Sequence, residues 1–185
     1  MADHYFIGIP ISESLQKNLR KWQEELRKSM NYKVWTHEKD FHITLKFLGA
    51  SADEKIEELK RELANVKTLP SFNVTIGPAG SFGQPKQPRV FHAGVEKHAA
   101  LIALQEMVET AAVELGWEKE KRAYTPHVTI AKKGAEGLSP LLINENKLFD
   151  EQFEEHVNQI CLYRIHPKQK QKYEAVATIW LNEEE

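Results

Sequence analysis

The chain alternates between segments whose apolar residues recur every three to four positions and short segments that are apolar at every second position. The first pattern is typical of helices with one buried face, and the second of half-buried strands. Three segments have the helical pattern, and we predict helices there: residues 13–29, a segment opened by Ser51 or Asp53, and residues 99–115. Ser12 or Ser14 is placed to cap the first helix, and Gly116 to end the third.

Shorter runs predict strands, because they are rich in apolar and β-branched residues and are bounded by turn residues. These runs are residues 5–10, 34–35, 41–48, 72–76, 89–95, 127–132, 156–165 and 173–181. The last two flank a basic turn and are predicted to form an antiparallel hairpin. Residues 77–88 are rich in Gly and Pro, which indicates a loop, and residues 133–146 have no regular pattern.

The order of these elements favours an α+β fold. Strands arrive both in adjacent pairs and next to helices, which favours antiparallel sheet over a doubly wound parallel sheet. The order of strand, helix, histidine-bearing strand and helix occurs twice, at a spacing too long for a solenoid repeat. We therefore predict a single domain over residues 1–185, built from two related lobes that share a cleft.

Composition limits the classes of function. The 185 residues are 41% hydrophobic and 28% charged, as in an ordinary soluble protein. The net charge of −2 argues against a protein that coats nucleic acid, but it leaves room for a pocket that takes one nucleotide end. Cys161 is the one cysteine, and neither a secretory signal nor an apolar run of transmembrane length is present. We expect a cytoplasmic protein with no membrane partner.

One four-residue pattern occurs twice. Residues 42–45 (HITL) and 127–130 (HVTI) are each a histidine, an apolar residue, a threonine and an apolar residue. On a strand, side chains at i and i+2 point the same way, so each copy presents an imidazole and a hydroxyl to one face. A single copy is commonly an ordinary surface strand. Two copies in corresponding places of a duplicated outline favour a shared site.

Two histidines suit a reaction that needs an acid and a base near neutral pH, such as phosphodiester cleavage. His42 and His127 would then flank the phosphate, while the hydroxyls of Thr44 and Thr129 donate to its non-bridging oxygens. Strict alternation also predicts that Lys46 lies on the face of Thr44 and adds a positive charge there. A solvated lysine at the end of a strand is an equally good interpretation of Lys46.

A metal site is the main rival. Two histidines are too few for a catalytic zinc, which takes three protein ligands, so His37 and His92 would have to be recruited by the fold. A serine nucleophile has less support, because no Gly-x-Ser-x-Gly run occurs, and Cys161 sits in the middle of a strand like a core residue. We expect no metal and no cofactor.

At the paired motifs the chain resembles the 2H phosphoesterase superfamily, and within it the RNA 2′,3′-cyclic phosphodiesterases, also called 2′-5′ RNA ligases. The likeness covers four segments in order: residues 5–10, 35–49, 89–95 and 122–130. The resemblance implies a bilobal fold in which two pseudo-symmetric lobes line a central cleft with antiparallel sheets and carry their helices outside. It also implies hydrolysis of a 2′,3′-cyclic phosphate to a 2′-phosphomonoester without metal or ATP.

The resemblance assigns roles to individual residues. His42 matches the proton donor to the departing O3′, His127 matches the base that activates water, and Thr44 and Thr129 match the phosphate-holding threonines.

Two further positions lie just before the second motif. Arg122 matches a basic substrate-binding position, and Tyr124 matches an aromatic position that contacts a base or ribose, although core packing explains Tyr124 equally well. His92 departs from the large apolar residue of many relatives. Lys132 is turned away from His127 by strict alternation, and residues 135–147 match nothing in the family.

The expected partner is an RNA or nucleotide with a 2′,3′-cyclic phosphate end, bound by a monomer. Two alternatives remain open. The same chemistry suits a 2′-5′ oligonucleotide or a cyclic phosphate of the ADP-ribose type. A non-catalytic module that binds RNA ends would instead use basic residues for affinity: Arg122, Lys119, Lys121 and the turn at residues 168–172.

Overall fold

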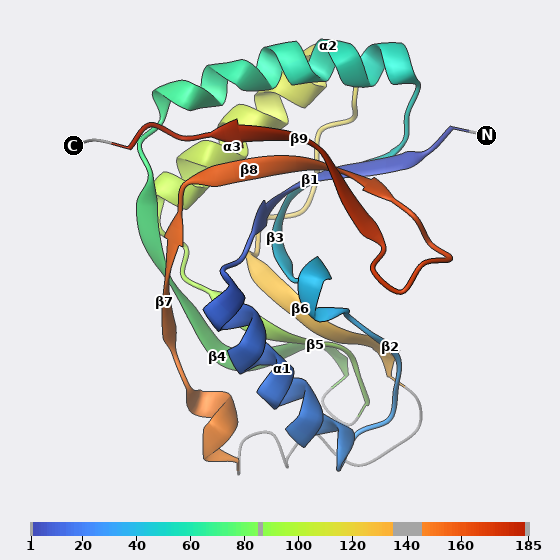
Figure 1. The fold of residues 1–185 in the computed structure, drawn as a ribbon, viewed down its shortest axis with the longest axis vertical. Helices are drawn as coiled ribbons and strands as arrows, with labels where there is room; N and C mark the ends of the chain where they lie inside the picture. The colour runs from blue at the N-terminus through green and yellow to red at the C-terminus, as the bar shows by residue number, and fades with distance from the viewer. Residues whose placement is uncertain (1, 85–86, 135–145, 184–185) are drawn as a thin grey trace.

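The computed structural model describes residues 2–84, 87–134 and 146–183 (Figure 1). Most of the segment 135–147, which lacks a family match, lies outside the described residues. The α-helices of the described chain are α1 (Glu13–Arg27), α2 (Asp53–Leu63) and α3 (Ala99–Glu114). Short 3₁₀ helices are η1 (Glu38–Asp40), η2 (Ala64–Thr68) and η3 (Lys147–Asp150). The strands are β1 (His4–Pro10), β2 (Tyr32–Trp35), β3 (His42–Ala50), β4 (Phe72–Gln84), β5 (Gln87–Val95), β6 (His127–Gly134), β7 (Phe153–Val157), β8 (Gln159–Ile165) and β9 (Tyr173–Trp180).

The described strands form one nine-stranded sheet with the order β7-β4-β5-β6-β3-β1-β8-β9, and β2 pairs with β6. Each pairing of these strands is antiparallel, which confirms the predicted α+β class. Strands β3 and β6 are joined through a single residue pair, Ile43 with Val128. The sheet is therefore two halves that meet at this pair, and each half ends in a histidine-bearing strand.

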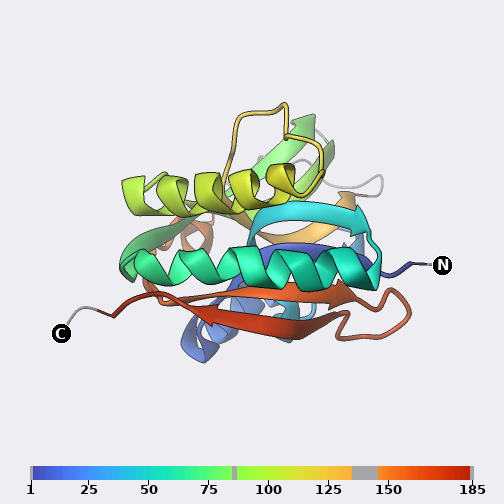
Figure 2. The same cartoon turned by 90° about the horizontal axis from the view of Figure 1, so that it is seen from above.

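The helices interlock the two halves. Helix α3 lies between β5 and β6 in the chain but packs on β3, while α1, which follows β1, packs on β6. Helix α2 lies beside α3, on the half formed by β1, β3, β8 and β9 (Figure 2). The apolar stripe of α1 is buried as its spacing predicts, with Leu19, Trp22 and Leu26 wholly inaccessible. The histidine-bearing strand of each half-sheet is thus covered by a helix that lies far from it in the sequence.

The predicted loop at residues 77–88 is wrong. Its described residues belong to the hairpin of β4 and β5. Gly77, with a φ of +102°, lies at a register shift, and Gly80 faces His92, where a Cβ would come within 2.7 Å of the imidazole Cε1. Beyond Ile76, β4 pairs only with β5, so this stretch is an edge that tolerates Gly and Pro. The residues that indicated a loop instead serve a bulge and a close packing contact.

The predicted strand at residues 156–165 is two strands. β7 pairs with β4 and β8 pairs with β1, at distant places in the sheet order, with Asn158 between them. The predicted hairpin of the last two runs is confirmed as β8 and β9. Ser12 caps α1 by accepting from the Leu15 backbone N–H, whereas the N-cap of α2 is Ala52, and Ser51 donates to the Gly49 carbonyl instead.

Candidate active site

The junction of the two half-sheets brings the two histidine motifs together. Ile43 pairs with Val128 in antiparallel register, so His42 lies opposite Thr129 and Thr44 lies opposite His127 when the register is carried one residue each way. Directly opposed residues in such a pair have Cβ atoms about 5 Å apart. The apolar partners Ile43 and Val128 are fully buried. Two imidazoles and two hydroxyls therefore share one face of the sheet, as the repeated pattern predicts.

Both imidazoles are held in the same tautomer by the backbone. His42 Nδ1 lies 2.7 Å from the carbonyl oxygen of Asp40, and His127 Nδ1 lies 2.8 Å from that of Thr125. A carbonyl oxygen only accepts, so each Nδ1 carries the proton and the Nε2 of each neutral ring is unprotonated and able to accept. His42 Nε2 accepts from the Thr44 hydroxyl at 2.9 Å.

Burial sets the ionisation of these rings. The pKa of His42 is lowered to about 4, mainly by burial and to a smaller extent by the nearby His127 and Lys132, while the hydrogen bond to the Asp40 carbonyl opposes the shift. Burial also lowers the pKa of His127. An aromatic cage surrounds His42, because the rings of Phe6 and Tyr173 lie 4.6 Å and 5.3 Å from it. The imidazoles of His42 and His127 are therefore neutral at pH 7 before a substrate binds.

The predicted position of Lys46 on the face of Thr44 is wrong. Thr44 pairs with Gly8 but Lys46 pairs with the adjacent Ile7, so Leu45 is an extra residue at a β-bulge. A bulge reverses which face the following residues occupy. Phe47 is therefore on the face of Thr44, and Lys46 points to the other side of the sheet.

On that side Lys46 is buried in an ion pair. Its Nζ lies 2.9 Å from Glu109 Oε1 on α3, and it donates to the Glu118 carbonyl at 2.6 Å. The same carboxylate oxygen accepts from the Glu120 backbone N–H. Lys46 thus anchors the segment that leads to Arg122, although its side chain also borders the larger cavity described below.

The second motif contains the same irregularity, and this reverses the prediction for Lys132. Phe91 pairs with Ala131 and His92 with Thr129, so Ile130 is an extra residue. Lys132 consequently lies on the face of Thr129 and lines a cavity together with His42. A signal for this was present in the sequence, where the consecutive apolar residues Ile130 and Ala131 break the alternation.

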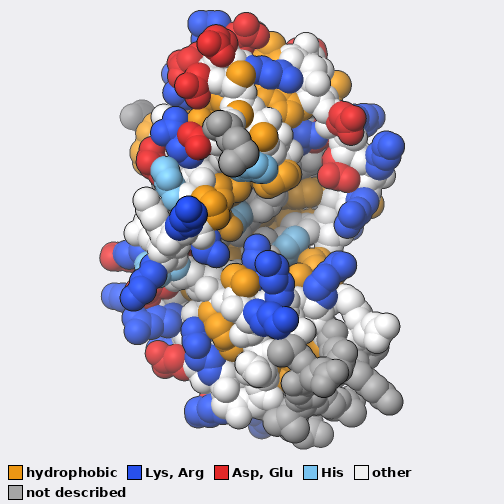
Figure 3. Space-filling view, turned by 90° about the vertical axis from the view of Figure 1, so that its right-hand side faces the viewer, with side chains coloured by type: hydrophobic (Ala, Val, Ile, Leu, Met, Phe, Trp, Pro, Cys, Tyr) orange, Lys and Arg blue, Asp and Glu red, His pale blue; other side chains and the backbone are white. Residues whose placement is uncertain are grey.

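Two cavities meet at Thr44 and Phe47. The smaller, of about 320 Å³, is lined by residues that include His42, Lys132, Lys172 and Tyr173, and none of the described residues in its lining is a carboxylate. The larger, of about 860 Å³, is lined by residues that include His127, Phe82, Arg122 and Tyr124. Figure 3 shows this face hollowed across its middle, with histidine side chains in the hollow and Lys and Arg side chains around it. Lys132 and Lys172 favour an anion at the smaller cavity.

The substrate-binding candidates lie at the larger cavity. The exposed Arg122 lines it. Tyr124 also lines it, and its hydroxyl donates to the Thr44 carbonyl at 2.8 Å, so the ring both packs on the core and borders the cavity. Sequence reasoning missed the aromatic residues Phe47, which is 60% exposed, and Phe82.

The His92 ring packs against the His127 ring. The two ring centroids are 5.1 Å apart, and the Phe82 ring lies edge-on to His127 at 4.9 Å. Burial lowers the pKa of His92 to about 4, so this neighbour is neutral. The other histidine of the metal hypothesis, His37, caps η1 by accepting from the Lys39 N–H. Among residues 2–84, 87–134 and 146–183, no group of three His, Cys, Asp or Glu side chains is arranged to hold a metal ion.

We predict that Lys132→Gln changes both the pH profile and substrate affinity. Loss of the charge raises the pKa of His42, so the limb of the kcat/KM profile that reports His42 moves to higher pH. KM rises about tenfold, because the variant cannot form a charge-assisted hydrogen bond to an anion. Both histidine pKa values lie below 6.5 in the free protein, so the wild-type optimum of kcat/KM lies on the acidic side of that value. The matched control is Lys133→Gln, and an equal change in both variants would contradict the assignment.

Known proteins resemble this chain over most of its length. A family model described as the 2′-5′ RNA ligase superfamily matches residues 11–169. A relative from Bacillus subtilis (strain 168) named RNA 2′,3′-cyclic phosphodiesterase is 33% identical over 179 residues, which cover 94% of this chain and 93% of that protein. A protein of the same name from Geobacillus stearothermophilus is 33% identical over 94% of this chain, but this chain spans only 56% of its length.

Solved structures share the fold. The crystal structure of E. coli LigT complexed with 3′-AMP superimposes with a TM-score of 0.78 at 19% identity, covering 99% of this chain and 100% of that one. The crystal structure of TT0787 of Thermus thermophilus gives a TM-score of 0.78 at 20% identity, covering 98% and 100%. The architecture thus defines an α+β fold in which two histidine motifs meet at the junction of two half-sheets, a fold that these solved structures share. The chain belongs to the 2′-5′ RNA ligase superfamily, a family of 2H phosphoesterases.

Proposed function

We propose that this protein is an RNA 2′,3′-cyclic phosphodiesterase that forms 2′-phosphomonoesters by metal-independent acid–base catalysis with His42 and His127. The observation that carries the proposal is the Ile43–Val128 junction, which brings both motifs to one face. The relatives named RNA 2′,3′-cyclic phosphodiesterase support the substrate class.

The proposed reaction is an in-line displacement at phosphorus. His127 Nε2 has a free lone pair and takes a proton from water as the water oxygen bonds to phosphorus. The bond from phosphorus to O3′ breaks, and His42 gives its Nε2 proton to that oxygen. Because His42 is neutral in the free protein, the substrate anion must raise its pKa, as an opposite charge nearby does.

The threonines and cations stabilise the charge that grows on the phosphate. Protonation of His42 Nε2 releases the Thr44 hydroxyl from its present hydrogen bond, and a rotation about its side chain then lets it donate to a non-bridging oxygen. Thr129 has the corresponding place beside His42, and Lys132 adds a positive charge. Phe47, Phe82 and Tyr124 provide apolar surfaces for the terminal base and ribose.

We predict that 2′,3′-cyclic mononucleotides and RNA with a 2′,3′-cyclic phosphate end are opened to 2′-phosphates. Chromatography against authentic 2′- and 3′-phosphates identifies the product, and activity persists after dialysis against a chelator. A 3′-phosphate product would reverse the roles of the leaving and retained oxygens. Loss of activity with the chelator, restored by a metal, would contradict the two-histidine mechanism.

A further inference from the structure

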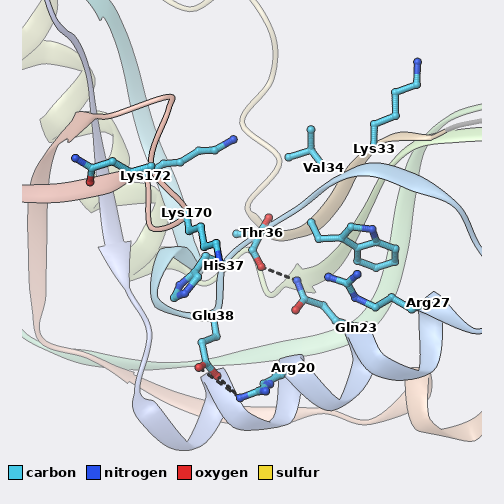
Figure 4. A pocket seen from close by; sticks show the side chains of 12 residues that line it. Arg20, Gln23, Arg27, Lys33, Val34, Thr36, His37, Glu38, Lys170 and Lys172 are labelled. Carbon is cyan, nitrogen blue, oxygen red and sulfur yellow. Dashed lines mark hydrogen bonds and ion pairs between the residues drawn. The ribbon is translucent and has the colours of Figure 1, made fainter.

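A third cavity, in which five of the twelve lining residues are Lys or Arg, adjoins the proposed active site. Its volume is about 480 Å³. We call it the basic pocket and define it by five residues, which come from α1, from β2 and from the turn between β8 and β9: Arg20, Arg27, Lys33, Lys170 and Lys172. Figure 4 shows these side chains, with Lys33 extending away from the others and Arg20 turned to Glu38, which is the one carboxylate among the described residues that line the pocket. Within the described part of the chain, five cations and one carboxylate line this pocket, which is a concentrated positive charge in a chain whose net charge is −2.

The basic pocket is continuous with the phosphate-binding side of the site. Lys172 lines both this pocket and the smaller cavity that holds His42 and Lys132. The turn that carries Lys172 is fixed there, because the Asp40 carboxylate accepts the backbone N–H groups of Lys172 at 2.7 Å and Tyr173 at 3.3 Å. Positively charged side chains therefore line both adjoining cavities, from Lys132 beside His42, through Lys172, to the basic pocket.

Contacts between different elements hold the side chains at the base of the basic pocket in place. The buried Gln23 amide donates to the carbonyls of Thr36 and Ile130, which ties α1 to β6 and to the end of β2. The Arg27 guanidinium lies over the Trp35 ring, 4.3 Å from its centroid. This contact orients the guanidinium, so that its N–H groups and its open face are held ready for a ligand.

From this geometry we infer that the basic pocket binds the RNA strand on the 5′ side of the cyclic phosphate; the inference depends on the proposed function. A single strand that leaves the terminal nucleotide carries further phosphates, and Lys172 marks the path they take. Bases of single-stranded RNA stack on arginine planes, and the Arg27 guanidinium offers such a plane. The pocket therefore makes the protein prefer cyclic-phosphate ends of oligonucleotides over cyclic mononucleotides.

The test compares a 2′,3′-cyclic mononucleotide with a four-nucleotide RNA that ends in the same cyclic phosphate. We expect Arg27→Gln/Lys33→Gln to lower kcat/KM about tenfold for the RNA and to leave the value for the mononucleotide unchanged. The dependence of log kcat/KM on log salt concentration should become shallower by about 0.7 for each phosphate that the variant no longer neutralises. Lys21→Gln is the matched control, since Lys21 is an exposed cation of α1 that does not line the pocket.

Each outcome has a distinct meaning. An equal loss for both substrates, or no loss for either, overturns the basic pocket while the proposed function stands. If the wild type turns over neither substrate, the proposed function fails. Binding of a four-nucleotide RNA with a 2′-phosphate end, measured by fluorescence anisotropy, then decides the pocket, and equal affinity of wild type and Arg27→Gln/Lys33→Gln rejects it. In the same assay Arg27→Lys should keep the salt dependence but weaken binding, because it retains the charge and loses the stacking plane.

Discussion

His42→Ala and His127→Ala are each expected to lower kcat by a hundredfold or more, the usual scale for a positioned acid or base. Each substitution removes one of the two proton-transfer groups, while the partner ring keeps its own carbonyl contact, to Asp40 or to Thr125. Steady-state turnover of a 2′,3′-cyclic nucleotide across pH measures both the loss and its form. The limb that reports the missing group should vanish from each profile, and the other limb should remain.

Two controls make this result specific. The double variant should be hardly slower than either single variant, because an acid and a base acting in one step are not additive. His37→Ala is a matched control, since His37 caps η1 and lines the basic pocket rather than the cavity of His42. Full activity in both single variants would refute the two-histidine mechanism.

The second large effect is on stability. Lys46→Met should lower the free energy of unfolding by about 3–5 kcal/mol, because it leaves the Glu109 carboxylate buried without its cation. The Lys46 and Glu109 side chains are only 6% and 13% exposed, so solvent screens this pair weakly. Urea denaturation followed by circular dichroism measures the change.

The double variant Lys46→Met/Glu109→Leu separates the ion pair from other roles of Lys46. It should recover much of the stability, since a buried pair is replaced by apolar residues of similar size. Recovery should be incomplete, because the Glu118 carbonyl and the Glu120 N–H lose their partners. If Lys46→Met raised KM and left stability unchanged, Lys46 would instead contact the substrate.

The sequence predicts which side chains of each histidine motif share a face better than it predicts which residues line the surrounding cavities. A histidine and a threonine two residues apart share a face on any regular strand, so the facing of His42 with Thr44 followed from local geometry alone. The fold class followed from the order of elements. What local pattern does not contain is the register between strands, because that depends on a partner distant in the chain.

The errors at Lys46 and Lys132 have this one cause. Each follows an extra residue, Leu45 or Ile130, that is visible only when the strand is paired with its neighbour. The same limit explains why the basic pocket was missed, since its side chains come from α1, β2 and the last hairpin. The prediction of a loop at residues 77–88 was wrong for another reason. Glycine is common in turns, but here Gly77 serves a β-bulge and Gly80 leaves room for the His92 side chain.

The exchange of helices between the two sheet halves has a consequence for dividing the chain. A fragment that ended before β4 would contain His42 but would lack the strand that α1 covers, and the helix that covers β3 would be missing as well. Neither half of the sequence therefore carries both a histidine-bearing strand and the helix that packs on it. Splitting this protein into complementing pieces should succeed only if both pieces fold together.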